Sequence, residues 1–292
     1  METQESIRTV TTIGEMQALS EQWRKQGVSI GLVPTMGYFH DGHLSLIRHA
    51  RQRCKVVVVS IFVNPIQFGV DEDFEQYPRD LERDSRMAAE AGADVLFAPA
   101  AAAMYGATFQ TAVQVKQITQ GLCGASRPGH FEGVTTVVCK LFHIVKPHLA
   151  VFGAKDYQQA MTIRRMIIDL DFDIDLDLAP IVREESGLAL SSRNEYLSPE
   201  ERREAAILFQ SLRLAERLIL QGERDPEKVL LAMQAMIDAV ASSKIDYIAL
   251  VDPETLTPVQ VIDRNIRILL AVYIGKTRLI DNYLVELSTG ID

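Results

Sequence analysis

The sequence has few cysteines and no long apolar run. Its 292 residues include 3 cysteines, at Cys54, Cys123 and Cys139, which are odd in number and too widely spaced for a disulfide framework or a zinc knuckle. No apolar stretch approaches the roughly 18 residues that a membrane span needs. The start METQESIRTV also lacks the apolar core of a secretory signal. We therefore expect a cytoplasmic protein from a reducing setting, with no membrane partner.

The sequence also lacks an excess of positive charge. It has 30 Lys and Arg against 39 Asp and Glu, a formal net charge of −9, so we expect no nucleic-acid partner. Hydrophobic residues make up 47% and charged residues 24%, as in ordinary globular proteins. The length suggests two domains. A site for a phosphate compound in such a chain must be assembled from a few local positive groups.

Short apolar runs alternate with helical patterns up to about residue 180. The β-branched run VVVVSIFV, Val56–Val63, is typical of a central parallel strand that is buried on both faces. Strands that alternate with helices predict βαβ units, and hence an α/β fold with a Rossmann-like parallel sheet and flanking helices. The predicted strands are Val28–Val33, Val56–Val63, Ala93–Ala98, Leu149–Phe152 and Ile174–Leu178, and the predicted helices are Leu44–Arg53, Leu81–Ala91, Val134–Val145 and Tyr157–Asp169.

The pattern changes near residue 181. A long amphipathic helix is predicted at Pro199–Leu220, with Ser198 as its N-cap, and a second helix at Glu227–Val240. Strands are predicted at Ile245–Val251, Ile266–Ile274 and Arg278–Leu287. Helices followed by strands indicate a smaller α+β domain over residues 182–292, after a first domain over residues 1–181.

The strongest motif is PTMGYFHDGH, Pro34–His43, which joins a predicted strand to a predicted helix. A helix N-terminus offers unpaired N–H groups and the positive end of a dipole to an anion. Glycines at positions 37 and 42 would let the backbone approach a phosphate. His40 and His43 are three residues apart and can share a helix face, where both can donate hydrogen bonds to phosphate oxygens. An ordinary turn with incidental histidines is the alternative; a zinc pair lacks a nearby third ligand.

Two polar segments follow other predicted strands. Asn64 and Gln67 come after the buried strand, where small ligands meet a parallel sheet. Lys155 and Asp156 come after the predicted strand Leu149–Phe152, although the spacing is not that of a P-loop. Each segment alone is also compatible with a polar turn.

Three further segments are weaker when taken singly. Asp84 lies on the helix after YPRD and could help hold Mg²⁺ on a triphosphate, although a solvated helix face explains it as well. Arg127 and His130 lie in a loop and are candidate anion contacts. The run Ser191–Arg193 supplies hydroxyls and a guanidinium, which grips phosphate oxygens well. The sequence has no GxGxxG fingerprint, so charge stabilisation is the chemistry it favours.

Six segments together resemble one family. PTMGYFHDGHLSL, SIFVNPIQF, YPRD, RPGHFEGVTTVV, VFGAKDYQQ and GLALSSRNEYL occur in the order and spacing of the pantoate–β-alanine ligases, the pantothenate synthetases of the HxGH nucleotidyltransferase superfamily. The resemblance is dense from Pro34 to Leu197 and weaker after Ser198. It implies a Rossmann-like domain of nucleotidyltransferase type, a smaller lid domain and a homodimer. It also implies ATP-dependent joining of (R)-pantoate to β-alanine through a pantoyl-adenylate, with release of AMP and pyrophosphate, and Mg²⁺ as cofactor.

The resemblance also implies roles for individual residues. His43, His40, Lys155 and Arg193 are the expected catalytic groups. The expected ATP contacts are Pro34, Thr35, Met36, Gly37, His40, Gly42, His43, Gly153, Lys155, Asp156, Val182, Leu190, Ser191, Ser192 and Arg193. The expected pantoate or β-alanine contacts are Gln67, Gln159, Asn64, Arg127 and His130, and Asp84 is the expected metal partner.

Three other functions share some of these features. Another HxGH nucleotidylyltransferase would keep the nucleotide in its product and would need more basic residues beside Gln67 and Gln159. A fragment of a class I aminoacyl-tRNA synthetase would need a basic tRNA-binding domain, which the net charge disfavours. A regulatory nucleotide-binding module would not need four intact basic groups, namely His40, His43, Lys155 and Arg193.

Overall fold

The chain folds into two compact units, each with its own sheet. A computed structural model describes residues 7–69 and 74–287. In that part of the chain, the first unit runs to Thr119 and also takes in Arg127–Ala154 and Gln159–Pro180. The second unit begins at Ile181 and also takes in Gln120–Ser126 and Lys155–Gln158. The sequence predicted one boundary near residue 181, whereas in the structure these two earlier short segments also belong to the second unit. They hydrogen-bond to residues there; for example, Asn282 Nδ2 donates to Lys155 O at 2.9 Å.

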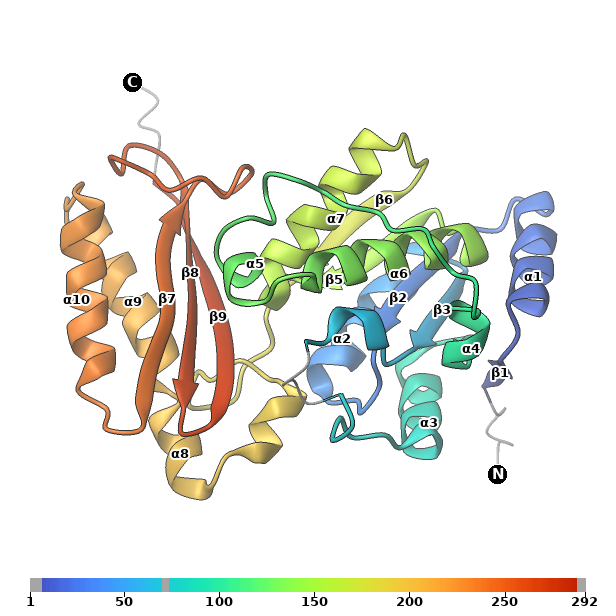
Figure 1. Cartoon of the computed structure of the whole chain (residues 1–292), viewed down its shortest axis with the longest axis horizontal. Helices are drawn as coiled ribbons and strands as arrows, with labels where there is room; N and C mark the ends of the chain where they lie inside the picture. Colours follow the sequence, from blue (N-terminus) through green and yellow to red (C-terminus); the bar gives the residue numbers. More distant parts are fainter. Residues whose placement is uncertain (1–6, 70–73, 288–292) are drawn as a thin grey trace. The chain divides into compact units, whose positions relative to one another are not determined.

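The first unit is built on a six-stranded sheet whose neighbouring strands are all parallel, in the order β1-β4-β3-β2-β5-β6 (Figure 1). Its strands are β1 Arg8–Val10, β2 Ile30–Thr35, β3 Val56–Ile61, β4 Val95–Phe97, β5 Leu149–Gly153 and β6 Asp175–Ala179. This confirms the predicted α/β fold with a parallel sheet. Strand β1, which has only 3 residues, was not predicted.

The strand order reverses beside β2. From β2 the chain passes to β3 and β4 on one side and later to β5 and β6 on the other. In open α/β sheets, ligands bind outside the carboxyl ends of the strands at such a switch point. The ends of β2 and β5, at Thr35 and Gly153, flank this point.

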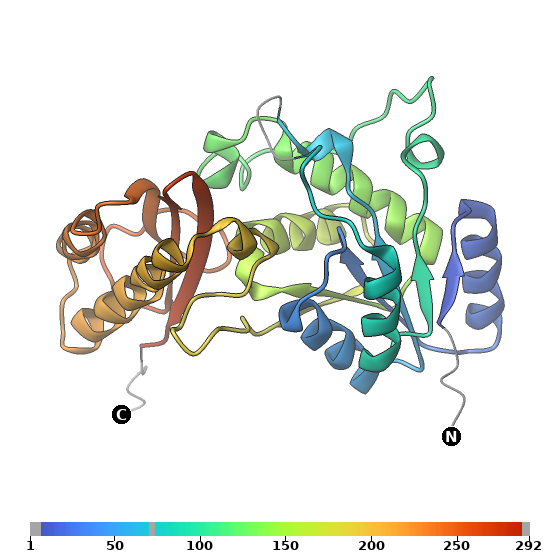
Figure 2. The same ribbon diagram turned by 90° about the horizontal axis from the view of Figure 1, so that it is seen from below.

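Helices cover both faces of this sheet. Along β2, Leu32 packs in the apolar cluster that includes α1 and α6, whereas Val33 packs in the cluster that includes α2 and α3. This alternation places α1, α6 and α7 on one face and α2 and α3 on the other (Figure 2). The helices of this unit are α1 Ile13–Lys25, α2 Asp41–Arg53, α3 Leu81–Ala91, α4 Ala101–Met104, α6 His130–Val145 and α7 Tyr157–Asp169. Helix α1 was not predicted, and α6 begins at His130 rather than at the predicted Val134.

The second unit packs helices against a three-stranded antiparallel sheet in the order β7-β8-β9 (Figure 1). Its strands are β7 Ser243–Val251, β8 Ile266–Ile274 and β9 Thr277–Val285, and its helices are α5 Cys123–Ser126, α8 Pro199–Glu204, α9 Ile207–Leu220 and α10 Pro226–Asp238. This confirms the smaller α+β part. No helix in the described ranges is long and apolar enough to cross a membrane.

The predicted single helix Pro199–Leu220 was wrong, because the structure divides it into α8 and α9. At the junction, the N–H of Ala206 bonds to Arg203 O at 3.3 Å and the N–H of Leu208 to Ala205 O at 3.2 Å. These bonds span three residues rather than four, which tightens the chain and ends the α-helix. The apolar periodicity continues across the junction and so conceals it.

Candidate functional site

The turn between β2 and α2 has an unusual backbone. Gly37 has φ 89° and Tyr38 has φ 54°, so two consecutive residues lie in the left-handed region. Glycine adopts this conformation readily, whereas tyrosine does so only at a cost. A Cβ on Gly37 would also lie 3.0 Å from Asp84 Oδ2 and 3.0 Å from Ile61 Cγ2. The turn therefore needs glycine at position 37 and support from outside at position 38.

Asp84 on α3 supplies that support. Its side chain is 1% exposed, and its Oδ2 and Oδ1 accept the backbone N–H groups of Tyr38 at 2.6 Å and of Phe39 at 2.7 Å. The preceding residue, Arg83, donates to Phe39 O at 3.0 Å and lies over the Tyr38 ring at 5.1 Å. Burial raises the pKa of the Asp84 carboxyl, and the two amide hydrogen bonds oppose that rise. Consecutive residues of α3 thus hold the turn in place.

His40 and His43 lie side by side at the start of α2, as the spacing predicted. His40 is the N-cap, and its Nδ1 accepts the Gly42 N–H at 3.1 Å. His43 Nδ1 accepts the His40 N–H at a longer 3.4 Å, and the ring centroids are 4.1 Å apart. A ring nitrogen that accepts a hydrogen bond carries no hydrogen, which assigns the hydrogen of each neutral imidazole to Nε2. In the neutral form, Nε2 is therefore the nitrogen of each ring that carries the hydrogen.

The amides that follow β3 form a buried network in the first unit. Asn64 Nδ2 donates to Gln67 Oε1 and to Gly133 O, both at 3.0 Å, and Asn64 Oδ1 accepts the Tyr105 hydroxyl at 2.7 Å. Gln67 Nε2 lies 3.2 Å from Met36 Sδ, which brings this network to the β2–α2 turn. Both N–H groups of the Asn64 amide are used within the protein, so this side chain orients Gln67.

Arg127, before α6, and His130, the first residue of α6, complete this network. His130 Nδ1 lies 2.9 Å from Gln67 O, and His130 Nε2 lies 3.0 Å from Arg127 Nη1. Gly133 allows the close approach of α6, since a Cβ there would lie 2.5 Å from Ile66 O. The structure therefore brings together four of the predicted substrate contacts, namely Asn64, Gln67, Arg127 and His130. We call these four residues the amide cluster.

The remaining predicted residues of the first unit lie at strand ends, except Gln159, which lies on a helix. Pro34 and Thr35 end β2, where Thr35 Oγ1 donates to Ser60 O at 2.6 Å. Gly153 is the last residue of β5. Gln159 is half-buried on the first turn of α7. Its neighbour Gln158 belongs to the second unit, where its side chain bonds to Cys123 N at 3.0 Å and Gly121 O at 2.9 Å.

The described residues offer no protein cage for a metal ion. Within the ranges 7–69 and 74–287, no group of three or more His, Cys, Asp and Glu side chains is placed to hold one. Both oxygens of Asp84, the predicted Mg²⁺ partner, accept backbone N–H groups. This arrangement makes the carboxylate a support for the turn.

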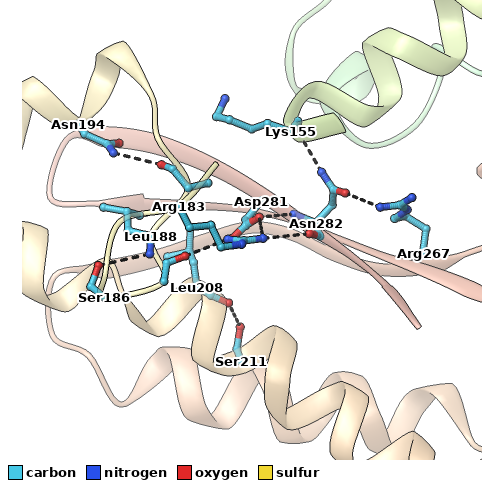
Figure 3. Close-up of polar contacts among 12 residues, drawn as sticks. Lys155, Arg183, Ser186, Leu188, Asn194, Leu208, Ser211, Arg267, Asp281 and Asn282 are labelled. Atoms are coloured by element: carbon cyan, nitrogen blue, oxygen red, sulfur yellow. Dashed lines mark hydrogen bonds and ion pairs between the residues drawn. The ribbon is translucent and has the colours of Figure 1, made fainter. Parts of the chain in front are cut away.

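Lys155 and Asp156 lie in the short 3₁₀ turn Ala154–Asp156, with Lys155 Nζ 3.5 Å from Asp156 Oδ2. Asn282 of β9 donates from Nδ2 to Lys155 O at 2.9 Å (Figure 3). Lys155 is thereby tied by its backbone to the sheet of the second unit, while its side chain is 20% exposed.

The other basic segment of the second unit follows a small hairpin. Val182 O accepts the Leu190 N–H at 2.9 Å, and Arg183 bridges to Ala189. The chain then enters the 3₁₀ turn Ser192–Tyr196, where Ser191 Oγ accepts the Arg193 N–H at 3.3 Å. The hairpin itself is held to β9 by the ion pair of Arg183 with Asp281, at 2.6 and 2.9 Å (Figure 3).

Sequence reasoning missed several residues that organise these groups. Tyr105 and Gly133 orient the amide cluster, and Asp281 and Asn282 hold the two basic segments. They carry no local signal, because each acts on a residue between 41 and 127 positions away, in an element that the sequence does not show to be a neighbour.

The parallel sheet, with a histidine-capped helix start beside its switch point, is typical of the class of α/β proteins that receive a phosphate-bearing small molecule. Comparison with known proteins identifies the family within this class. The model of the family "Pantoate-beta-alanine ligase" matches residues 8–284. Pantothenate synthetase of Moorella thermoacetica is 54% identical over 284 residues, which cover 97% of this chain and 99% of that protein. The Thermotoga neapolitana enzyme is 53% identical over 276 residues, which cover 94% and 99%.

Solved structures agree with this comparison. The crystal structure of pantothenate synthetase from Thermus thermophilus is similar with a TM-score of 0.91 and 46% identity, covering 96% of this chain and 100% of that one. A pantoate–β-alanine ligase from Francisella tularensis, complexed with β-γ ATP and β-alanine, gives a TM-score of 0.79 and 35% identity, covering 97% and 99%. The chain belongs to the pantoate–β-alanine ligase family and is an enzyme of the ligase class.

Proposed function

We propose that this enzyme joins (R)-pantoate to β-alanine at the expense of ATP, through a pantoyl-adenylate, and releases AMP and pyrophosphate. Membership of the family supports the overall reaction. The single observation that carries the proposal is the pair of histidines at the start of α2, whose Nδ1 atoms are used by the backbone so that both Nε2–H groups are donors. This is a geometry for stabilising charge on phosphate oxygens.

The reaction needs an activated acid, because a carboxylate oxygen is a poor leaving group. The pantoate carboxylate attacks the α-phosphorus of ATP, and the bond from this phosphorus to the bridging oxygen of pyrophosphate breaks. The amine of β-alanine then attacks the acyl carbon of the adenylate. The carbon–oxygen bond to AMP breaks, the amide forms, and the nitrogen loses a proton to solvent.

The basic groups are assigned to the phosphates. His40 and His43 would hydrogen-bond to the phosphate chain, and Lys155 and Arg193 would neutralise the charge that grows on the departing pyrophosphate. Ser191 would also contact the phosphates, and its Oγ caps the turn that carries Arg193 by accepting the Arg193 N–H at 3.3 Å. The backbone and side chains of the other predicted ATP contacts would line the nucleotide: Pro34, Thr35, Met36, Gly37, Gly42, Gly153, Asp156, Val182, Leu190 and Ser192.

Pantoate is assigned to the amide cluster and Gln159. Amides suit its hydroxyl groups, since each amide both donates and accepts. Asn64 and His130 hold the side chain and the backbone of Gln67, so they would act by orienting it. The guanidinium of Arg127 suits a substrate carboxylate.

Three wider features complete the proposal. Mg²⁺ would enter as MgATP, held by phosphate oxygens, because the described residues form no cage for it. The part after residue 181 would act as a lid over the nucleotide. The enzyme would act as a homodimer in the cytoplasm. The cytoplasmic setting fits the three widely spaced cysteines.

The direct test is incubation of the purified protein with MgATP, pantoate and β-alanine, followed by measurement of pantothenate and nucleotides. We expect pantothenate and AMP in equal amounts, with no product when any substrate is omitted. Pantothenate with ADP would contradict the adenylate route. No pantothenate, together with nucleotide transfer to another acceptor, would contradict the reaction itself.

A further inference from the structure

Asn282 on β9 is a buried amide that contacts the backbone of a proposed catalytic lysine. It is 1% exposed, its Nδ2 donates to Lys155 O at 2.9 Å, and its Oδ1 accepts Arg267 Nη1 at 3.0 Å (Figure 3). A buried amide with partners on both of its atoms has a fixed orientation. The position of the Lys155 peptide is therefore set by β9, 127 residues away.

The partner of Asn282 contacts the same segment at a second point. The guanidinium of Arg267 lies over the Tyr157 ring, 3.9 Å from its centroid, and the Tyr157 hydroxyl donates to Pro253 O at 2.9 Å. The segment Lys155–Gln158 is thus held at its first and third residues by one connected group of side chains. These contacts explain why the segment belongs to the second unit, although it connects β5 to α7 along the chain.

The residue before Asn282 fixes the strand at this point. Asp281 Oδ1 accepts the Asn282 N–H at 2.7 Å, and both Asp281 oxygens pair with Arg183, at 2.6 and 2.9 Å. The Asp281 side chain is 1% exposed. The buried pair makes the backbone of Asn282 rigid, so that its amide can act as a fixed support (Figure 3).

We propose that Asn282 is a positioning residue for adenylate formation, which acts by holding the Lys155 peptide so that the lysine side chain starts from a fixed point and direction. The proposal rests on the proposed function, in which Lys155 neutralises the ATP phosphates. The position and direction of the Cα–Cβ bond set the region that the ammonium can reach through the four rotatable bonds of the lysine side chain. Small displacements of a charge-stabilising group cost large factors in rate.

The test is a double-mutant cycle on the first half-reaction, measured as pantoate-dependent exchange of labelled pyrophosphate into ATP. We expect Asn282→Ala to lower kcat for exchange about tenfold, with the KM for pantoate unchanged because the amide cluster is not touched. Lys155→Ala is expected to lower it by about 10²-fold or more. The double variant is expected to be no slower than Lys155→Ala, since Asn282 has nothing left to position.

Two further variants separate positioning from general loosening. Asn282→Asp keeps an acceptor for Arg267 but places a carboxylate oxygen, which cannot donate, next to Lys155 O. The exchange rate of this variant should therefore be no higher than that of Asn282→Ala. Tyr283→Phe is the matched control on the same strand: it removes the bonds of Tyr283 to Arg213 and Glu216, at 2.7 and 2.9 Å, and should leave exchange within about twofold.

The inference is overturned by additive losses in the double variant, by a wild-type rate for Asn282→Asp, or by an equal loss in Tyr283→Phe. The proposed function is tested separately, because the wild-type protein either forms pantothenate and AMP or does not. If the wild-type enzyme forms pantothenate and AMP while the losses in the cycle are additive, the proposed function stands and only the role of Asn282 is refuted.

Discussion

Replacement of Asp84 separates two roles for this carboxylate, support of the β2–α2 turn and binding of Mg²⁺. The carboxylate makes two hydrogen bonds to backbone N–H groups, at 2.6 and 2.7 Å, in a site where its side chain is 1% exposed. Hydrogen bonds to a charged group contribute about 1.5–3 kcal/mol each. Since burial raises the pKa of Asp84 and so offsets part of this gain, a value of about 2 kcal/mol for each bond applies.

The two substitutions should therefore differ in a defined way. Asp84→Asn keeps one acceptor and turns an amide N–H toward the second backbone N–H, which should cost about 2 kcal/mol. Asp84→Ala leaves both N–H groups buried without that acceptor and should cost about 4 kcal/mol. Urea unfolding measures both values. Because the turn carries His40, each variant should also lose at least about tenfold in kcat/KM for ATP.

A Mg²⁺ titration at saturating ATP distinguishes the metal role. Support of the turn predicts the loss in stability without any ligand and an unchanged Mg²⁺ midpoint. A wild-type unfolding free energy for Asp84→Asn, together with a raised Mg²⁺ midpoint, would refute the structural reasoning. Asp80→Asn is a matched control, because the Asp80 side chain caps α3 through the Arg83 N–H at 3.0 Å, whereas the N–H groups of Tyr38 and Phe39 bond to Asp84.

Three further predictions concern other parts of the first unit. Gly133→Ala would place a methyl group against the Pro65–Gln67 turn, 2.5 Å from its backbone, and should raise the KM for pantoate about tenfold and cost about 1–3 kcal/mol in urea unfolding; an unchanged KM would contradict this packing. His43→Ala should lower turnover about 10²-fold or more in steady-state assays, and a near-normal rate would remove His43 from the mechanism. Partial burial raises the pKa of Asp177, but the hydrogen bond with His49 at 2.8 Å helps to keep this pKa below its usual value. Asp177→Asn should therefore lower the free energy of unfolding by up to about 1 kcal/mol at pH 7. That difference should shrink as the pH falls below about 4 and through the lowered pKa, and a constant difference would argue against the ion pair.

Local patterns predicted the elements that carry strong local signals. The run Val56–Val63 and the alternation of strands and helices predicted the parallel sheet, and the motif Pro34–His43 predicted a histidine pair at a helix start, which the structure shows as a 4.1 Å ring contact. The missed helix α1 also had a signal, namely Thr12 as N-cap, with Met16 and Trp23 on one face. For α1, the N-cap and the spacing of the apolar residues could therefore have predicted the helix from the sequence.

Other features have no local signal. Gly133 resembles any helical glycine until Ile66 O is placed 2.5 Å from its missing Cβ. Asp84 looks like a residue on a solvated helix face, yet it is buried under a turn 45 residues earlier in the chain. Such roles depend on which elements pack together, and periodicity does not contain that information. This is why the amide cluster was predicted as a set of substrate contacts, while its internal supports were not predicted.

The central claim is that the pantoate carboxylate attacks the α-phosphorus of ATP. The most direct measurement uses pantoate with both carboxylate oxygens labelled with ¹⁸O, followed by mass spectrometry of the products. The account predicts one ¹⁸O atom in AMP and one in the amide of pantothenate, because the bond between the acyl carbon and the oxygen shared with AMP breaks when the amine attacks. AMP without ¹⁸O, or label in inorganic phosphate with ADP as the nucleotide product, would contradict it.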